Sequence, residues 1–543
     1  MKSKTMIKEA KARKAGKVMK ATERSGINSK AKIAGAIHSS GSPKRVKVLV
    51  VFGTRPEVIK LAPVIEALRQ QAGAADASNA SFQPVICFTG QHREMVEPFL
   101  EIFDLKPDYD LHVMQENQPL AGLTARLLVR LDKVLEAEAP DWVIVQGDTT
   151  TAMAASLAAF YRKIKVGHVE AGLRTEDKYN PFPEEINRRL ISHLADLHFA
   201  PTPRARENLL KEGLDRQRIF VTGNTVVDAL HMILKKADEP GWSEKLKGKI
   251  KEIKRGDLTP GKSAATGQRK KAGKHGAAGI TSWLDAILER GRTALTAASS
   301  ASQAAVVGVR AVHWAMGEAT DPASSRRNAH YDVAQVGANA PATASATISP
   351  ASKATPDSPN TAADSFATPS PSCPTKLILV TAHRRESFGE GMERICQAIS
   401  RVVSRVAEAE VIFPVHLNPN VRSVVLSHLS GIERVHLVEP LDYLTFVYLM
   451  RQADLILTDS GGIQEEAPSL GVPVIVMRDK TERSEAVEAG VAWLGGTDPE
   501  IIEKLAVELL MKVESGEFRR GLKRRNPFGD GHAAARIIKR LGT

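Results

Sequence analysis

The chain has 543 residues, of which 43% are hydrophobic, and this length suggests two to four domains of ordinary size. No apolar stretch approaches the roughly 20 residues that span a bilayer, so a membrane protein is not expected. The net charge of +13 does not indicate a nucleic-acid binder, because most of it belongs to residues 1–45 and 258–374 and leaves the rest of the chain nearly neutral.

Residues 1–45 form a basic extension with 13 Lys or Arg and two acidic residues. They contain no Phe, Trp or Tyr and no apolar core, which argues against a nucleic-acid arm and against a secretory signal. Such a polar segment is expected to be disordered, and an organelle transit peptide stays open as an alternative. The odd count of three cysteines, without a CxxC pair, indicates a reducing compartment and a cytoplasmic location.

Residues 46–240 alternate strand-like and helical patterns. Val46–Phe52 is an apolar run interrupted by one lysine, as in a parallel strand that is covered on both faces. Pro56 suits the first turn of the helix that follows, where apolar residues recur at helical spacing. Similar strand–helix units begin at Trp142–Val145 and Ile219–Val221. Repeated units of this kind predict a Rossmann-like domain with a parallel sheet.

Charged residues stand at the strand ends and helix starts of this domain. Arg55 and Lys60 at the start of a helix suit a diphosphate, although two solvated cations are the alternative. Asp148 and Glu170 each follow a strand, and Glu184 begins a helix after two prolines. Each carboxylate alone is better explained by helix capping. Three of them in successive loops predict convergence on one cleft, as acid–base chemistry at a carbon centre requires.

Residues 258–374 change in character and become rich in Ala, Ser, Thr, Gly and Pro, and residues 338–374 are of low complexity. We expect a disordered insert, because so few apolar side chains cannot offset the entropy of ordering. The stretch 282–316 holds Trp and aliphatic residues, which leaves open a helix that contacts a partner.

Residues 376–543 resume the alternation and predict a second Rossmann-like domain. Its strands are expected at Leu377–Val380, Val411–Val415 and Leu455–Leu457. His383 and His416 follow the first two of these strands. A lone histidine is usually structural, but two at the same sheet edge favour a functional interpretation.

The third of these strands leads into Ser460, Gly461 and Gly462 and then into a helix. Glycines at such a turn let the backbone approach a phosphate, which the free N–H groups of the helix start then bind. Glu466 lies about one turn into the helix, where a carboxylate can accept both hydroxyls of a ribose. A tight turn followed by a solvated pair of glutamates is the alternative for this segment by itself.

Together these segments resemble the non-hydrolysing UDP-N-acetylglucosamine 2-epimerases over about residues 46–235 and 376–540. The resemblance rests on strings that occur in the family's order: FGTRPE, GDTTT, HVEAGLRT, PEEINR, HRRESFG, PVHLNPNV and TDSGGIQEEAPSLG. It implies an α/β protein of the GT-B kind, in which two doubly wound Rossmann-like domains (here 46–240 and 376–543) face a cleft, and it implies a homodimer. The extension and the insert are departures from the family.

The resemblance also implies roles for single residues. The catalytic residues would be Asp148, Glu170, Glu184 and His383. The substrate-binding residues would be Arg55, Lys60, Arg188, Phe446 (beside the uracil), Ser460, Gly461, Gly462, Glu466 (at the ribose) and Arg483. Gln91, Glu94 and His416 resemble an allosteric UDP-N-acetylglucosamine site that some members have.

The reaction that the resemblance implies is the interconversion of UDP-N-acetylglucosamine and UDP-N-acetylmannosamine, in the service of polysaccharide biosynthesis. Loss of the carbon 2 proton with departure of UDP gives 2-acetamidoglucal, and UDP then adds back. The scheme needs no cofactor and no metal. Three alternatives stay open: a GT-B glycosyltransferase, a hydrolysing epimerase that releases free N-acetylmannosamine, and a non-enzymatic regulator that binds a UDP-sugar.

Overall fold

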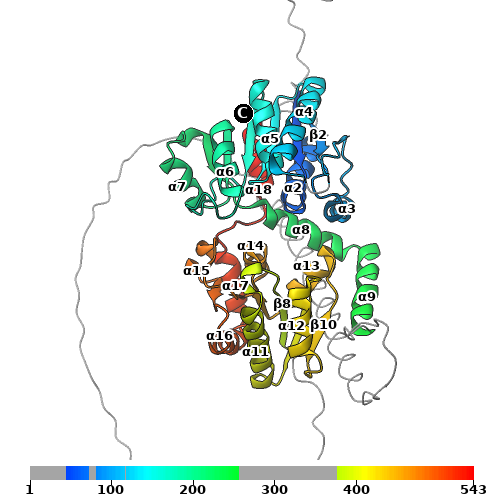
Figure 1. The fold of residues 1–543 in the computed structure, drawn as a ribbon, viewed down its shortest axis with the longest axis vertical. Coiled ribbons are helices and arrows are strands. Elements are labelled where there is room, and N and C mark those ends of the chain that lie inside the picture. Colours follow the sequence, from blue (N-terminus) through cyan, green and yellow to red (C-terminus); the bar gives the residue numbers. More distant parts are fainter. Residues whose placement is uncertain (1–44, 73–80, 116–117, 256–375, 543) are drawn as a thin grey trace, which may run out of the picture.

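The computed structural model describes residues 45–72, 81–115, 118–255 and 376–542, which form two α/β domains, one above the other in Figure 1. The predictions made for the basic extension up to residue 44 and for the insert 258–374 lie outside the described residues. Within the described ranges, no helix is both long and apolar enough to cross a membrane.

The first domain is built on a seven-stranded parallel sheet in the order β3-β2-β1-β4-β5-β6-β7. Its strands are β1 (Arg45–Phe52), β2 (Ser81–Phe88), β3 (Tyr109–Asp110), β4 (Trp142–Gln146), β5 (Lys165–Val169), β6 (Leu197–Ala200) and β7 (Ile219–Val221). β1 pairs with β2 from Arg45 opposite Ser81 to Phe52 opposite Phe88. The last five residues of β1 are buried, because helices cover both faces of the sheet.

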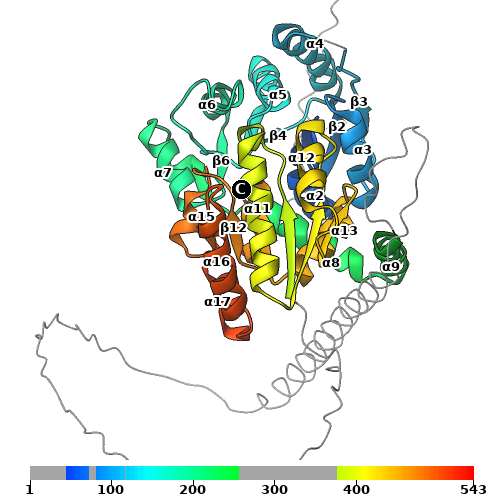
Figure 2. The same cartoon turned by 60° about the horizontal axis from the view of Figure 1, so that its bottom comes forward.

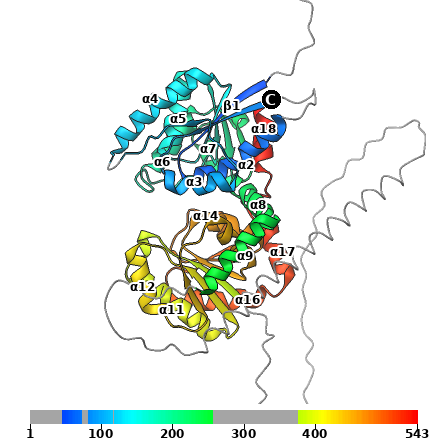
Figure 3. The same cartoon turned by 90° about the vertical axis from the view of Figure 1, so that its right-hand side faces the viewer.

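Eight helices of the described residues accompany this sheet: α2 (Arg55–Ala72), α3 (Arg93–Ile102), α4 (Leu120–Glu138), α5 (Thr150–Tyr161), α6 (Glu184–Leu194), α7 (Pro203–Lys211), α8 (Thr225–Asp238) and α9 (Pro240–Arg255). α2 and α8 pack on one face, and α4 and α5 pack on the other (Figure 3). The described chain continues as helix α9 beyond the domain boundary expected at residue 240.

The second domain is built on a six-stranded parallel sheet in the order β10-β9-β8-β11-β12-β13. The strands are β8 (Lys376–Thr381), β9 (Ala409–Pro414), β10 (Val435–Val438), β11 (Leu455–Thr458), β12 (Val474–Val476) and β13 (Ala492–Leu494). The helices are α11 (Glu390–Arg405), α12 (Pro419–Leu429), α13 (Tyr443–Gln452), α14 (Gly461–Leu470), α15 (Ser484–Glu488), α16 (Pro499–Lys512) and α17 (Gly516–Arg525). α11, α12 and α16 cover one face of the sheet (Figure 2).

The last helix, α18 (Ala533–Leu541), returns to the first domain and packs on α2 and α8 (Figure 1). Asp228 of α8 fixes this return, because its carboxylate accepts the backbone N–H groups of Ala533 and Ala534 at 3.2 and 2.9 Å. These are two of the donors that a helix start leaves without a partner inside the helix. The predicted class, an α/β protein with two doubly wound parallel sheets, is confirmed. The end of the chain belongs to the packing of the first sheet.

Candidate active site

A cavity of about 500 Å³ lies between the two domains, beyond the carboxyl ends of the central strands of the first sheet. Four carboxylates and six cations are among the residues that line it: Asp148, Glu170, Glu184, Glu482, Arg55, Lys60, Arg174, Arg188, Arg384 and Arg483. The structure therefore brings together the three carboxylates that the sequence singles out. Burial of a charge is costly unless it is paired, and the buried charges Lys60, Glu170 and Arg188 are each paired.

Glu170 directly follows β5 and is 8% exposed. Its Oε1 accepts the amide of Asn224 at 2.9 Å and the ammonium of Lys60, and its Oε2 accepts the amide of Gln146. The backbone of Glu170 is in the left-handed region, at φ 63°. A residue with a side chain is strained there, and such strain persists at functional sites where the surroundings over-determine the conformation. Glu170 is thus held in a single orientation at the cavity wall.

Asp148 follows β4, and its carboxylate is held by Arg188 of α6. The Nε of Arg188 lies 3.1 Å from Oδ2, and the Nη2 atom contacts the same oxygen. The neighbouring Asn187 donates to the backbone oxygen of Asp148 at 3.0 Å. Arg188, which the family resemblance implies as a substrate ligand, therefore also orients a predicted catalytic carboxylate.

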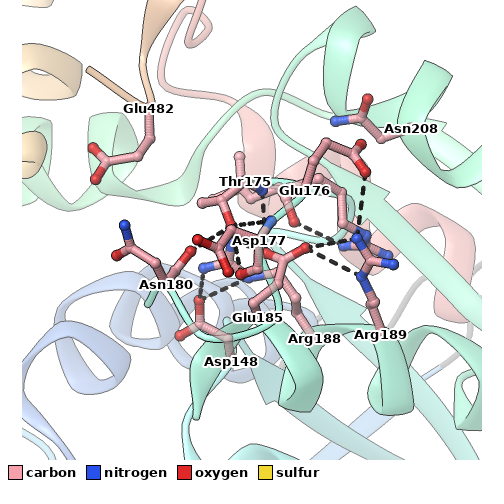
Figure 4. A network of polar contacts seen from close by, with 12 residues as sticks. Asp148, Thr175, Glu176, Asp177, Asn180, Glu185, Arg188, Arg189, Asn208 and Glu482 are labelled. Atoms are coloured by element: carbon pink, nitrogen blue, oxygen red, sulfur yellow. Dashed lines mark hydrogen bonds and ion pairs between the residues drawn. The ribbon is translucent and has the colours of Figure 1, made fainter. Parts of the chain in front are cut away.

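Glu184 and Glu185 stand side by side at the start of α6 and do different things. Glu184 lines the cavity. Glu185 is fully buried and accepts Arg188 at 3.1 Å, Arg189 at 3.1 Å and the N–H of Thr175 at 3.1 Å. Figure 4 shows Arg188 and Arg189 both reaching Glu185, with Asp148 beyond Arg188. Sequence reasoning missed Glu185, although the Glu–Arg spacings of three and four residues on one helix are a signal for such pairs.

In the second domain, β11 turns into α14 at Ser460, whose N–H donates to the Oγ1 of Thr458 at 2.9 Å. Arg483 packs closely on Gly461, where a Cβ atom would lie 3.2 Å from the guanidinium carbon. The Nε of Arg483 donates to Glu465 at 2.9 Å, and the buried carboxylates around it raise the pKa of Arg483 against the opposing effect of burial. The start of α14 thus offers backbone N–H groups next to a fixed cation, a combination that suits a diphosphate.

Glu466 is buried and accepts the hydroxyl of Tyr443, on α13, at 2.9 Å. Burial raises the pKa of Glu466 to about 7, and the hydrogen bond from Tyr443 opposes this rise. Phe446, the residue expected beside the uracil, lies one turn further along the same helix and is half-buried. The predicted base and ribose ligands therefore stand on α13 and α14, which pack on each other. Tyr443 was not foreseen from the sequence.

His383 lies on the loop after β8, and Asp459 holds that loop. One oxygen of the fully buried Asp459 accepts the backbone N–H groups of His383 and Arg384, each at 2.7 Å. The other oxygen lies 3.4 Å from the His383 Nδ1. Burial lowers the pKa of His383, and Asp459 opposes the effect.

The three residues of the predicted allosteric site lie in different surroundings. His416 stacks on His383, with ring centroids 5.7 Å apart and an angle of 21° between the planes. Gln91 accepts the hydroxyl of Thr151 at 2.8 Å, and Glu94 is exposed in the first turn of α3. The structure thus places His416 against His383, the histidine predicted to be catalytic, while Gln91 and Glu94 lie on the opposite domain.

A second cavity of about 570 Å³ adjoins the first and shares Leu173, Arg174, Thr175 and Glu482 with it. Within it, Arg478 pairs with both Glu386 and Glu482, the latter at 3.0 Å. No group of three or more His, Cys, Asp or Glu side chains suited to a metal ion occurs in the part of the chain that the structure describes.

Two Rossmann-like sheets that face each other across one cavity define the GT-B class of enzymes. The chain belongs to the UDP-N-acetylglucosamine 2-epimerase family: the family model of that description matches residues 75–257 and 333–542. Its relatives include the UDP-N-acetylglucosamine 2-epimerase of Yersinia pestis, which is 40% identical over 91% of this chain and 98% of its own. The enzyme of the same name from Escherichia coli K12 is 39% identical over the same shares.

A solved structure leads to the same family. The UDP-GlcNAc 2-epimerase from Neisseria meningitidis, bound to UDP-GlcNAc, is 36% identical and superposes with a TM-score of 0.62 over 91% of this chain and 99% of its own. The predicted family, the GT-B-like fold and the class of isomerases acting on carbohydrates are thereby confirmed.

Proposed function

We propose that this protein interconverts UDP-N-acetylglucosamine and UDP-N-acetylmannosamine by eliminating UDP and adding it back. The observation that best supports the proposal is one cavity in which Asp148, Glu170 and Glu184 meet six cationic side chains. A UDP-sugar needs cations for its diphosphate, and inversion at carbon 2 needs an acid and a base on opposite faces of the ring. The relative that was crystallised with UDP-GlcNAc, at 36% identity, supports this choice of ligand.

In the proposed elimination a carboxylate takes the proton from carbon 2, and the bond between carbon 1 and the diphosphate oxygen breaks. The electrons of the C–H bond form the double bond of 2-acetamidoglucal, and those of the C–O bond leave with UDP. Arg55, Lys60 and Arg483 stabilise the departing diphosphate, with the N–H groups of Gly461 and Gly462. Re-addition of UDP with protonation on the other face of carbon 2 gives the epimer.

The sequence left open which carboxylate serves which face, and the contacts divide the three into two kinds. Glu170 and Asp148 are each fixed by cationic side chains. Glu184 makes no ion pair with the described residues and lines the cavity directly. We therefore assign Glu184 to one face of the sugar ring, where it transfers a carbon 2 proton that it exchanges with solvent. We assign Asp148 and Glu170 to the opposite face of the ring.

Incubation with UDP-N-acetylglucosamine in D₂O, followed by NMR, tests the reaction. We expect deuterium at carbon 2 and both epimers still linked to UDP. Turnover without deuterium at carbon 2 would contradict the elimination. Release of free N-acetylmannosamine as the main product would favour a hydrolysing epimerase, and transfer of the sugar to an added acceptor would favour a glycosyltransferase.

We also propose that UDP-N-acetylglucosamine activates the enzyme at a site that includes Gln91, Glu94 and His416. The stacking of His416 on His383 supports a route from such a site to the catalytic loop. Activation predicts that trace UDP-N-acetylglucosamine accelerates the reverse reaction and that His416→Ala removes the acceleration. Equal initial rates with and without the trace would contradict this part of the proposal.

The expected homodimer and cytoplasmic location complete the proposal. The free thiols of Cys87 and Cys396 support a reducing compartment. Light scattering on the purified protein measures the assembly, and a mass of one chain would contradict the dimer.

A further inference from the structure

Glu465 of α14 joins the two domains inside the protein. It is 1% exposed, and it lies outside the set of residues that line the catalytic cavity. Its Oε2 accepts the amide of Asn224 at 3.1 Å and lies 3.3 Å from the ammonium of Lys60, both in the first domain. Its Oε1 accepts Arg483 of its own domain at 2.9 Å. One carboxylate of the second domain thus binds two side chains of the first.

Those same two side chains also hold Glu170. Lys60 and Asn224 both donate to Oε1 of Glu170. The four charged groups of this cluster, Lys60, Arg483, Glu170 and Glu465, sum to zero, which is the condition under which buried charges are tolerated. Removal of any one of them leaves a buried charge without compensation.

We propose that Glu465 is a positioning residue that fixes Lys60 and Asn224, and through them Glu170, when the two domains are closed on each other. The inference rests on the proposed function, because it assumes that Lys60 and Glu170 act in the epimerisation. Glu465 acts through these side chains and has no contact with the sugar. Its neighbour Glu466 instead accepts a hydrogen bond from Tyr443. Of the two adjacent glutamates of α14, Glu465 thus acts in domain closure and Glu466 in nucleotide binding.

The charges around Lys60 make the pH profile of kcat a test of the proposal, because a purely structural role of Glu465 would leave that profile unchanged. The charged groups around Lys60 include Glu170, Glu465 and Arg483, and Glu466 of the same helix α14 interacts with it as well. Burial and Arg483 act against the charge, but the two carboxylates outweigh them and raise the pKa of Lys60. Loss of the charge of Glu465 therefore lowers the pKa of Lys60. Since a protonated Lys60 assists the departing diphosphate, the basic limb of the pH profile of kcat moves to lower pH.

The test compares Glu465→Gln with the matched control Glu488→Gln. Glu488 pairs with Arg204 across the same two domains at 2.8 Å, but both side chains are at least half exposed. For Glu465→Gln we expect kcat to fall roughly 100-fold, the size typical of a small misplacement of reacting groups, with KM changed less than about threefold. The basic limb of kcat moves to lower pH. Glu488→Gln keeps the kcat, KM and pH profile of the wild-type protein.

Glu465→Asp separates the effect of the negative charge from the effect of side-chain length. It also provides the test if Glu465→Gln does not fold. It keeps the charge on a shorter side chain, so we expect the basic limb to stay near its wild-type position while kcat remains low. An unchanged kcat in either variant overturns the proposal, as does a low kcat in Glu465→Gln with an unmoved basic limb. Absence of epimerisation by the wild-type protein in the same assay would instead contradict the proposed function.

Discussion

The two walls of the catalytic cavity are built differently. The wall from the first domain carries three carboxylates, of which Asp148 is held by Arg188 and Glu170 by Lys60, while Glu184 is free of ion pairs with the described residues. The wall from the second domain consists of Arg384, Glu482 and Arg483, and Arg483 packs on Gly461 at the start of α14, the helix that also carries Glu466. Locked charges suit proton transfer, whereas a helix start and a hydrogen-bond acceptor suit binding. The difference teaches that turnover and affinity should be separable by substitution.

The largest effect is expected on the first wall. Replacing Asp148 or Glu170 by its amide, or making the Glu184→Gln substitution, keeps the size of the side chain and removes its proton transfer. We expect each variant to lose turnover by about 10²- to 10⁴-fold, the usual contribution of a positioned acid or base. Steady-state kinetics measures kcat, and calorimetry measures UDP affinity, which should be largely kept.

Near-normal turnover of Asp148→Asn would show that this carboxylate serves only to hold Arg188. A parallel loss of UDP affinity in all three variants would break the division between the two walls. Glu185→Gln is a useful control, because Glu185 contacts Arg188 but does not line the cavity, and its effect should be smaller than that of Asp148→Asn.

The second wall should show the opposite behaviour. Glu466→Ala removes the expected acceptor of the ribose hydroxyls, and hydrogen bonds to a charged group are worth about 1.5–3 kcal/mol. We therefore expect UDP affinity to fall by roughly 10- to 150-fold, as measured by calorimetry. Tyr443→Phe, which removes only the hydroxyl that holds Glu466, should weaken UDP binding less. Unchanged affinity in Glu466→Ala would mean that this carboxylate only pairs with Tyr443.

The sequence was sufficient to predict what depends on local patterns. Apolar runs predicted strands such as Val46–Phe52 and Leu455–Leu457. Residues that follow strands of the first sheet, such as Arg55, Asp148 and Glu170, met in one cavity because parallel strands share an edge. β2 was not predicted, since it contains Pro84. A proline is tolerated there because β3 pairs only with Cys87 and Phe88 and leaves the rest of that edge free.

What could not be predicted were the partners of buried polar groups. Glu184 and Glu185, and likewise Glu465 and Glu466, are adjacent and chemically equal in the sequence. The partner that each glutamate takes depends on contacts between residues far apart, such as Asn224 with Glu465. The return of α18 to the first domain depends in the same way on a distant acceptor, Asp228.

The pH dependence of UDP-sugar binding is a further way to test the binding role of Glu466. Glu466 has a pKa raised from 4.5 to about 7, in surroundings that include Tyr443, Glu465, Lys60 and Arg55. Ribose hydroxyls donate to the ionised form, so binding below pH 7 must release a proton. We expect affinity for UDP-N-acetylglucosamine to rise with pH, by at most about tenfold per unit, and to level off above pH 7.

Calorimetry at several pH values, in buffers of different ionisation enthalpy, measures the proton release directly. Glu466→Gln is the matched variant, and its affinity should lose this part of the pH dependence. Identical pH slopes for the two proteins would mean that Glu466 is already ionised in the free enzyme or does not contact the ribose.

The smallest effect is expected from the insert between the two walls. Among the described residues, those that line the cavity run up to Arg188 in the first domain and start again at Arg384 in the second. In the sequence, the insert therefore stands between the residues of the two walls. The insert consists mostly of small and polar residues. Lengthening a loop destabilises a fold only slightly, since each doubling of the loop length adds about 0.6 kcal/mol to the entropic cost of closing it. We therefore expect that replacing residues 258–374 by a short Gly/Ser linker leaves kcat and KM within about twofold of the full chain.

Limited proteolysis of the intact protein should cut first within 1–45 and 338–374, as read by mass spectrometry. A deletion variant that is soluble and binds UDP but has lost turnover would mean that the insert takes part in domain closure. In that case Glu465 would not be sufficient to hold the two walls together.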